Sequence, residues 1–105
     1  MYKLKISKFY KEDTSSSYNY IKYKLEAPMA ANNLKKEIKE KINKIKENPN
    51  IRPLVQDKYL ASLGYRLINV KNYMIFYIIY NKIIDINAMK SFGGVSNILY
   101  IILFF

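Results

Sequence analysis

The sequence predicts an α+β fold: an N-terminal strand, an α-helical hairpin and then an antiparallel three-stranded meander, with the helices packed on one sheet face. Three observations support this fold class. Apolar and polar residues alternate over residues 2–7, as in a half-buried strand. Two helical patterns meet at Pro28, a residue that favours a turn followed by the start of a helix. Three apolar segments then follow, separated by two-residue polar turns. With 105 residues, the chain is expected to form a single domain over 1–105.

The first helix is predicted over residues 8–26, because Tyr18, Ile21 and Leu25 fall at i, i+3 and i+7 on one face. Three consecutive serines at 15–17 lower the helix propensity, so we expect the helix to be weak or broken there.

The second helix is predicted from Pro28 to about Asn48, immediately before Pro49. Its apolar positions follow a 3.6-residue period and are expected to face the sheet: Ala31, Leu34, Ile38, Ile42 and Ile45. The opposite side is mostly lysine and is expected to be solvated: Lys35, Lys36, Lys39, Asn43 and Lys46.

A loop is predicted over residues 50–63. The three strands of the meander are predicted over 64–70, 73–80 and 83–88. The middle strand is apolar on both alternations, which predicts a central strand buried on both faces. In the last strand, Asp85 and Asn87 are expected on one face, and the other face is expected to carry Ile84, Ile86 and Ala88.

The tail, residues 91–105, departs from this pattern. Gly93 and Gly94 interrupt the chain, and Ile98–Phe105 is wholly apolar. The longest apolar runs span eight residues, whereas a membrane-spanning helix needs ~20. The N-terminus lacks the apolar stretch of a secretory signal. We therefore expect a cytoplasmic chain with no membrane partner, whose tail packs on its own core or beneath a partner.

The chain is strongly basic, since 18 Lys and Arg against 8 Asp and Glu give a formal charge of +10. This balance predicts a polyanionic or acidic partner. The absence of cysteine and histidine excludes disulfide scaffolds, thiol nucleophiles, Ser-His triads and most zinc sites. No triplet of carboxylates suggests a metal site, so neither a metal nor a cofactor is expected.

Several short segments occur in a distinctive order. The hairpin reads Tyr20-Ile21…Leu25…Pro28-Met29-Ala30-Ala31…Leu34, and its second helix ends with Ile45…Asn48-Pro49. The meander reads Gly64-Tyr65-Arg66…Val70-Lys71-Asn72-Tyr73-Met74-Ile75-Phe76-Tyr77, followed by the strand Ile83–Ala88. Over roughly residues 1–90, this order resembles the RelE/ParE family of toxins from bacterial type II toxin–antitoxin modules, although no single motif is diagnostic.

The resemblance implies a small growth-inhibiting toxin that is neutralised by an antitoxin encoded beside it. Some members of the family cleave mRNA in the ribosomal A site, and others poison DNA gyrase. For the gyrase-directed branch, the resemblance makes the helical hairpin a plausible contact surface. The antitoxin is usually an acidic chain whose C-terminal segment wraps the toxin, which suits a partner of charge +10. The expected partners are therefore an acidic antitoxin and either the ribosome with its mRNA or DNA gyrase.

For the nuclease branch, the resemblance implies basic residues on the open sheet face that stabilise the charge developing as the RNA 2′-hydroxyl attacks. The candidate catalytic residues are Arg66, Lys90 and Tyr77. Met74 stands where a key arginine is common in that branch. The places of its other arginines fall near Asn87, Phe92 and Gly93. The candidate nucleic-acid or target-binding residues are Lys58, Lys71, Tyr73 and Lys82.

Each candidate also has a structural interpretation. Arg66 is equally compatible with a surface ion pair to Asp57 or Asp85, and tyrosines in a central strand are more often core residues with a bonded hydroxyl. The missing arginines favour the ParE-like branch, directed at gyrase or inactive, over a ribosome-dependent endoribonuclease without a metal. A basic nucleic-acid-binding module with no toxin role is the third hypothesis.

Overall fold

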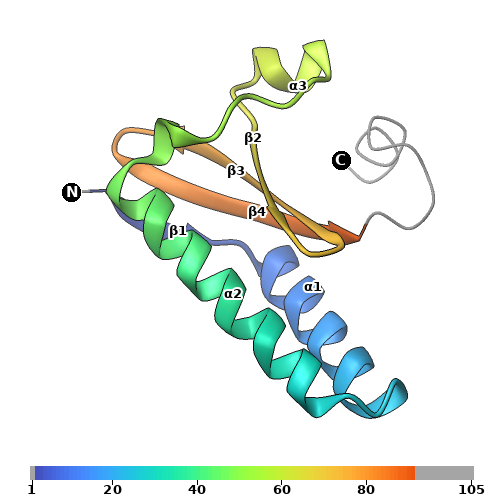
Figure 1. Ribbon diagram of the computed structural model, residues 1–105. Coiled ribbons are helices and arrows are strands. Elements are labelled where there is room, and N and C mark those ends of the chain that lie inside the picture. The colour runs from blue at the N-terminus through green and yellow to red at the C-terminus, as the bar shows by residue number, and fades with distance from the viewer. Residues whose placement is uncertain (1, 92–105) are drawn as a thin grey trace.

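The computed structural model describes residues 2–91 (Figure 1). Its elements, in chain order, are β1 (Lys3–Ile6), α1 (Lys8–Asn19), the π-helical turn η1 (Tyr20–Lys24), α2 (Pro28–Glu47), the 3₁₀ turn η2 (Pro49–Ile51), α3 (Lys58–Ser62), β2 (Arg66–Val70), β3 (Tyr73–Tyr80) and β4 (Ile83–Ser91). The predicted order of strand, helical hairpin and meander is confirmed. The expectations for the tail beyond residue 91 lie outside the described residues.

The four strands form one sheet in the order β1-β4-β3-β2. The meander strands are antiparallel, whereas β1 runs parallel to β4, with Leu4 opposite Ile84 and Ile6 opposite Ile86. The chain therefore returns to its N-terminal strand at the end of the fold. Asn81 and Lys82 both have positive φ, 46° and 60°, as the turn between two tightly connected strands requires.

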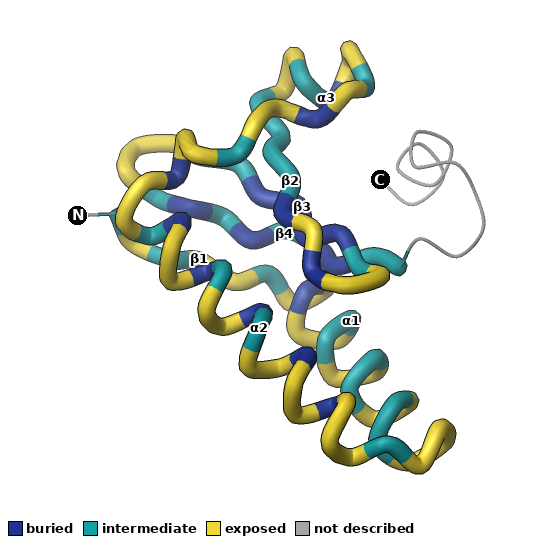
Figure 2. The backbone as a smooth tube through the Cα atoms, in the orientation of Figure 1, coloured by how far each residue is buried: buried dark blue, intermediate teal, exposed yellow. Residues whose placement is uncertain are grey.

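The hairpin of α1 and α2 covers one face of the sheet (Figures 1 and 2). The helix positions predicted from the sequence are all buried against it: Ala31, Leu34, Ile38, Ile42 and Ile45. The sheet contributes Ile75 and Tyr77 of the central strand together with apolar residues of its neighbours, including Ile68 and Ile86. The α2 boundary also agrees with prediction, because the helix ends at Glu47 and Pro49 follows.

A second, smaller core lies on the other face of the sheet. It contains Val55, Leu60, Met74 and Phe76. Leu60 comes from α3, a short helix whose N-cap Asp57 accepts a hydrogen bond from the Leu60 backbone N–H at 2.8 Å. The expectation of a plain loop over 50–63 is therefore wrong, and the central strand is buried on both faces because α3 covers the face that the hairpin leaves open.

The first helix differs in detail from its prediction. The serines at 15–17 lie within an unbroken α1, and the irregularity comes later, in the π-helical η1. Its N-cap is Ser7, whose hydroxyl oxygen accepts a hydrogen bond from the Tyr10 backbone N–H at 3.0 Å. The same hydroxyl donates to the Asn87 carbonyl oxygen. Ser7 therefore anchors the start of the hairpin to β4.

A β-bulge at Asn87 interrupts the pairing of β3 with β4. Phe76 is opposite Ala88, whereas the next residue, Tyr77, is opposite Ile86. Because the extra residue shifts the alternation, Ala88 shares a face with Phe76, away from Ile84 and Ile86. The expectation that Ala88 lies with these two isoleucines is therefore wrong. β2 starts later than predicted, because Gly64 adopts φ +92° in the turn that precedes this strand.

Candidate functional site

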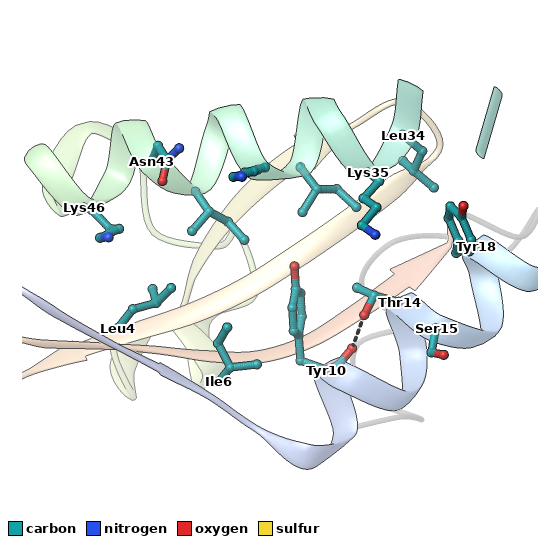
Figure 3. A pocket seen from close by; sticks show the side chains of 13 residues that line it. Leu4, Ile6, Tyr10, Thr14, Ser15, Tyr18, Leu34, Lys35, Asn43 and Lys46 are labelled. Carbon is teal, nitrogen blue, oxygen red and sulfur yellow. Dashed lines mark hydrogen bonds between the residues drawn. The ribbon is translucent and has the colours of Figure 1, made fainter. Parts of the chain in front are cut away.

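An open cleft of about 470 Å³ lies between α1, α2 and β1 (Figure 3). Its apolar floor is formed by Leu4, Ile6, Tyr10, Leu34, Ile38 and Ile42, and its rim by Thr14, Ser15, Tyr18, Lys35, Lys39, Asn43 and Lys46. The cleft is mostly apolar with a polar rim, which is the usual character of a site that binds another molecule. We call it the interhelical cleft.

The same periodicity that builds the core also builds this cleft. Leu34, Ile38 and Ile42 are on the buried stripe of α2, and the same three side chains also line the cleft. Leu4 and Ile6 reach the cleft from the inner face of β1, the last strand at this edge of the sheet. Because no strand lies beyond β1 within residues 2–91, the apolar floor continues to an open edge.

The charge of the rim is entirely positive. Lys35, Lys39 and Lys46 line the cleft, and none of its lining residues is acidic. The Lys35 ammonium also lies 5.5 Å from the centre of the Tyr18 ring, a cation–π distance. An apolar floor within a lysine rim is complementary to a chain segment that carries apolar side chains on one side and carboxylates beside them.

Tyr10 is the polar group of the cleft floor. The residue is buried, with 6 % of its surface exposed. In Figure 3 its ring rises from α1 with the hydroxyl directed toward α2. Within residues 2–91 this hydroxyl makes no hydrogen bond, and burial raises its pKa to about 12. At neutral pH it is therefore an un-ionised donor that faces the cleft without a partner from the described chain.

The structure does not bring the three candidate catalytic residues together. Arg66 lies on the edge strand β2, opposite Tyr77, and its guanidinium donates to the Arg52 carbonyl oxygen. Lys90 lies on β4, opposite Met74, and its ammonium is 3.7 Å from the Asp13 carboxylate of α1. Arg66 and Lys90 are therefore on opposite sides of the central strand.

Tyr77 is wholly buried among the residues under the hairpin, and its hydroxyl donates to the Pro49 carbonyl oxygen at 2.8 Å. Burial raises the pKa of Tyr77, and the positive charges of Arg66 and Arg52 oppose this only in part. The interpretation of Tyr77 as a core tyrosine with a bonded hydroxyl describes this environment.

The ion pair expected for Arg66 with Asp57 or Asp85 is not formed. Asp57 caps α3, as described above, and the Asp85 carboxylate is 3.9 Å from the Lys5 ammonium. The Asn87 side chain, near one of the places of a family arginine, instead accepts a hydrogen bond from the Tyr65 hydroxyl at 3.2 Å. The Arg66 guanidinium is therefore bound by the backbone carbonyl of Arg52 and not by an acidic side chain.

The predicted binding residues are distributed over three places. Lys58 is exposed at the start of α3, and Lys82 is exposed at the turn between β3 and β4. Lys71, Tyr73 and the catalytic candidate Lys90 come together, because all three line a second, wider hollow of about 980 Å³ beneath the far end of the hairpin. Lys71 there is 3.6 Å from the Glu37 carboxylate.

Asp13 is a polar link in this hollow that the sequence did not indicate. Its carboxylate accepts a hydrogen bond from the Met89 backbone N–H at 3.2 Å, in addition to its ion pair with Lys90. β1 has ended at this point, so the carboxylate occupies the place where the next strand would accept this bond. Lys90 is thereby held by a carboxylate that also supports the end of β4.

Two negative findings concern only the described part of the chain. Among residues 2–91, no three histidine, cysteine or acidic side chains are placed to hold a metal ion. None of the helices in that range is both long enough and apolar enough to cross a membrane.

Sequence reasoning missed the interhelical cleft and Tyr10. The alternation in β1 and the periodicity of α2 identified most of the apolar residues, but as core residues. Tyr10 itself stood outside the Tyr18, Ile21 and Leu25 pattern that defined the first helix.

Comparisons with known proteins agree with this architecture. A family model described as the ParE toxin of the type II toxin–antitoxin system parDE matches residues 4–88. Among solved structures, the chain is similar to one from the chromosomal ParDE TA system of P. aeruginosa, with a TM-score of 0.70 and 17% sequence identity. That match covers 87% of this chain and 96% of the other. No curated protein matches the sequence. Since the family model covers most of the chain, the protein belongs to the ParE toxin family of type II toxin–antitoxin systems.

Proposed function

We propose that this chain inhibits bacterial growth and is neutralised by an acidic antitoxin that binds in the interhelical cleft. The observation that carries the antitoxin part is the cleft itself: an apolar floor, a rim of Lys35, Lys39 and Lys46, and no acidic lining residue. The solved structure that this chain resembles is described as a ParDE toxin–antitoxin system, which supports a partner of that class here.

The occupant that fits the cleft is an amphipathic segment with carboxylates next to its apolar side chains. Its apolar side would cover Leu34, Ile38 and Ile42, while its carboxylates would meet the lysines of the rim. Opposite charge accelerates association with this +10 chain and raises its specificity. The Tyr10 hydroxyl adds one directed hydrogen bond to an interaction that is otherwise apolar and coulombic.

We further propose that growth inhibition is ParE-like, directed at DNA gyrase, and does not involve RNA cleavage. The separation of Arg66 from Lys90 and the burial of Tyr77 support this choice, because general acid–base catalysis needs its groups within hydrogen-bond reach of one substrate. Met74, at the place of a key arginine, is wholly buried.

Induction of the chain alone in a bacterial culture tests both parts of the proposed activity. We expect growth to stop and thymidine incorporation to fall before methionine incorporation. The Arg66→Ala variant is expected to inhibit growth as the parent does, because Arg66 bonds a backbone carbonyl within the fold. An earlier fall in methionine incorporation that Arg66→Ala abolishes would support the endoribonuclease alternative. Unchanged growth would contradict a toxin role.

The cleft is tested by the Tyr10→Phe variant in binding to the acidic protein encoded by the neighbouring gene. Loss of one hydrogen bond is expected to weaken binding about fivefold, since such a bond contributes ~1 kcal/mol. Phenylalanine retains the buried ring, so the unfolding midpoint is expected to stay near that of the parent. Isothermal titration at several salt concentrations measures both the affinity and its charge dependence.

Tyr80→Phe is the matched control, because Tyr80 is exposed at the end of β3, away from the cleft. Similarly, Lys39→Glu in the rim is expected to weaken binding more than Lys82→Glu at the β3–β4 turn. Equal binding by all four variants would place the antitoxin elsewhere on the surface.

A further inference from the structure

Exposed apolar side chains gather at the tip of the hairpin, where the chain passes from α1 through η1 into α2. Tyr20, Tyr23, Leu25 and Met29 are the members, and Met29 and Tyr23 are 79% and 66% exposed. The tip is the end of the hairpin farthest from α3, and Figure 2 shows it as largely exposed. None of the four lines the interhelical cleft, whereas Tyr20 and Leu25 reach the second hollow. We call these four residues the tip patch.

The backbone of the tip is shaped by two unusual features. In η1 the Leu25 backbone N–H donates to the Tyr20 carbonyl oxygen at 3.0 Å, five residues back. Glu26 then has φ +50°, a left-handed conformation that a residue with a Cβ seldom adopts. The Ala27 N–H closes the turn on the Ile21 carbonyl at 3.0 Å. Isolated π-turns and left-handed non-glycine residues occur often at functional sites, and here both display the tip patch.

Positive charge surrounds the tip patch. Lys22, Lys24 and Lys36 lie near it in the sequence of the hairpin, and Glu26 is the one acid between Tyr20 and Lys36. The salt bridges within residues 2–91 use none of these three lysines. The Lys22 ammonium is instead 5.6 Å from the Tyr18 ring centre and 5.1 Å from that of Tyr23. Lys24 and Lys36 are therefore available to an external acidic group, and Lys22 adds positive charge beside the two rings.

We propose that the tip patch is the surface by which the toxin docks on its target, and that the docking site is an acidic protein surface with apolar groups at its centre. This rests on the proposed growth inhibition, and it adds a target surface separate from the antitoxin cleft. Tyrosine and methionine are enriched at the centres of protein interfaces, where they bury apolar area. A rim of lysines gives the complementary charge.

Protein is favoured over nucleic acid as the occupant. Nucleic-acid platforms offer aromatic faces for base stacking, but Lys22 already lies over the rings of Tyr18 and Tyr23. Leu25 and Met29 offer apolar side chains without flat faces. A mixed aliphatic and aromatic patch with lysines nearby matches the surface of a folded acidic protein more closely.

The double variant Tyr23→Ser/Met29→Ser tests the proposal without disturbing the core, because both side chains are exposed and neither lines the interhelical cleft or the second hollow. Phe9→Ser/Tyr59→Ser is the matched control, with two side chains of similar exposure, 72% and 71%, on α1 and α3. We expect the tip variant to lose at least tenfold in growth inhibition at equal protein level, as loss of central interface contacts does. The control variant is expected to inhibit growth as the parent does.

Purified DNA gyrase and antitoxin provide the direct measurements. The tip variant is expected to bind gyrase at least tenfold more weakly than the parent and the antitoxin equally well, with an unchanged unfolding midpoint. Full growth inhibition by the tip variant would overturn the proposal while leaving the proposed function intact. An inactive parent would overturn both.

Two further results would also overturn the inference. A single-stranded oligonucleotide that binds the parent tenfold more tightly than the tip variant would make the patch a nucleic-acid surface. A dimeric parent with a monomeric tip variant in sedimentation would make it a contact between two copies of the chain.

Discussion

Substitution of arginine for Met74 is expected to unfold the protein rather than to give it ribonuclease activity. Met74 stands where the resemblance leads us to expect a key arginine in the nuclease branch, yet here it is wholly buried with Val55, Leu60 and Phe76. None of the described residues is a buried charged residue that could pair with an arginine there. A buried, unpaired charge costs several kcal/mol, of the order of ~3–5, which approaches the whole stability of a small domain at ~5–15 kcal/mol.

Circular dichroism during urea unfolding measures this effect, with Met74→Leu as the control. Leucine has a similar volume and is expected to cost less than ~1.5 kcal/mol. A Met74→Arg protein that unfolds at the parental urea concentration would contradict the expectation, because it would mean that α3 moves aside and that the position is accessible. If that variant also cleaved ribosome-bound mRNA, the preference for a ParE-like activity would lose its main structural support.

The regular elements of this fold could be predicted from the sequence because each has a pattern of its own. Leu34, Ile38 and Ile42 recur at helical spacing, and Pro28 and Pro49 bracket the same helix. The central strand is apolar on both alternations, and it is indeed buried on both faces. These signals are local, so they do not depend on contacts with distant parts of the chain.

The irregular elements could not be predicted because they depend on distant partners. The bulge at Asn87 is accompanied by contacts with Ser7 and Tyr65, which are far away in the sequence. The Cα pairing of β1 with β4 joins the two ends of the fold, and no local pattern specifies it. The five residues of α3 are too few to show a helical period, so the sequence of residues 50–63 did not indicate a helix.

The candidate site could be predicted only in its residue types. Charge predicted an acidic or polyanionic partner, but not which surface would receive it. Arg66, Lys90 and Tyr77 were grouped by chemistry, and the sheet register then placed Arg66 and Lys90 on opposite sides of β3. Lys35 and Lys39 were expected on a solvated helix face, whereas they also rim the interhelical cleft. A register and a bulge decide such placements, and both are properties of the whole sheet.

Tyr77→Ala is expected to destabilise the protein by ~3–5 kcal/mol, as is typical for truncating a large buried aromatic residue. The phenyl ring fills the core beneath the hairpin, and the hydroxyl joins the sheet to η2 through the Pro49 carbonyl at 2.8 Å. Tyr77→Phe separates the two contributions, because it keeps the ring and leaves the buried carbonyl without its donor. That loss is expected to cost ~1–3 kcal/mol.

Thermal unfolding and growth inhibition, measured on the same variants, distinguish this structural role from a catalytic one. For a domain of this size, 1 kcal/mol lowers the unfolding midpoint by about 4–8 °C. Tyr77→Phe is therefore expected to unfold at a lower temperature yet to inhibit growth fully wherever it remains folded, and Tyr80→Phe at the exposed end of β3 is expected to change neither. The opposite result, a parental midpoint with lost inhibition, would make the hydroxyl catalytic. It would require the Pro49 bond to open during turnover, and the segment that follows Pro49, including the Arg52 carbonyl that holds Arg66, would then be the moving part.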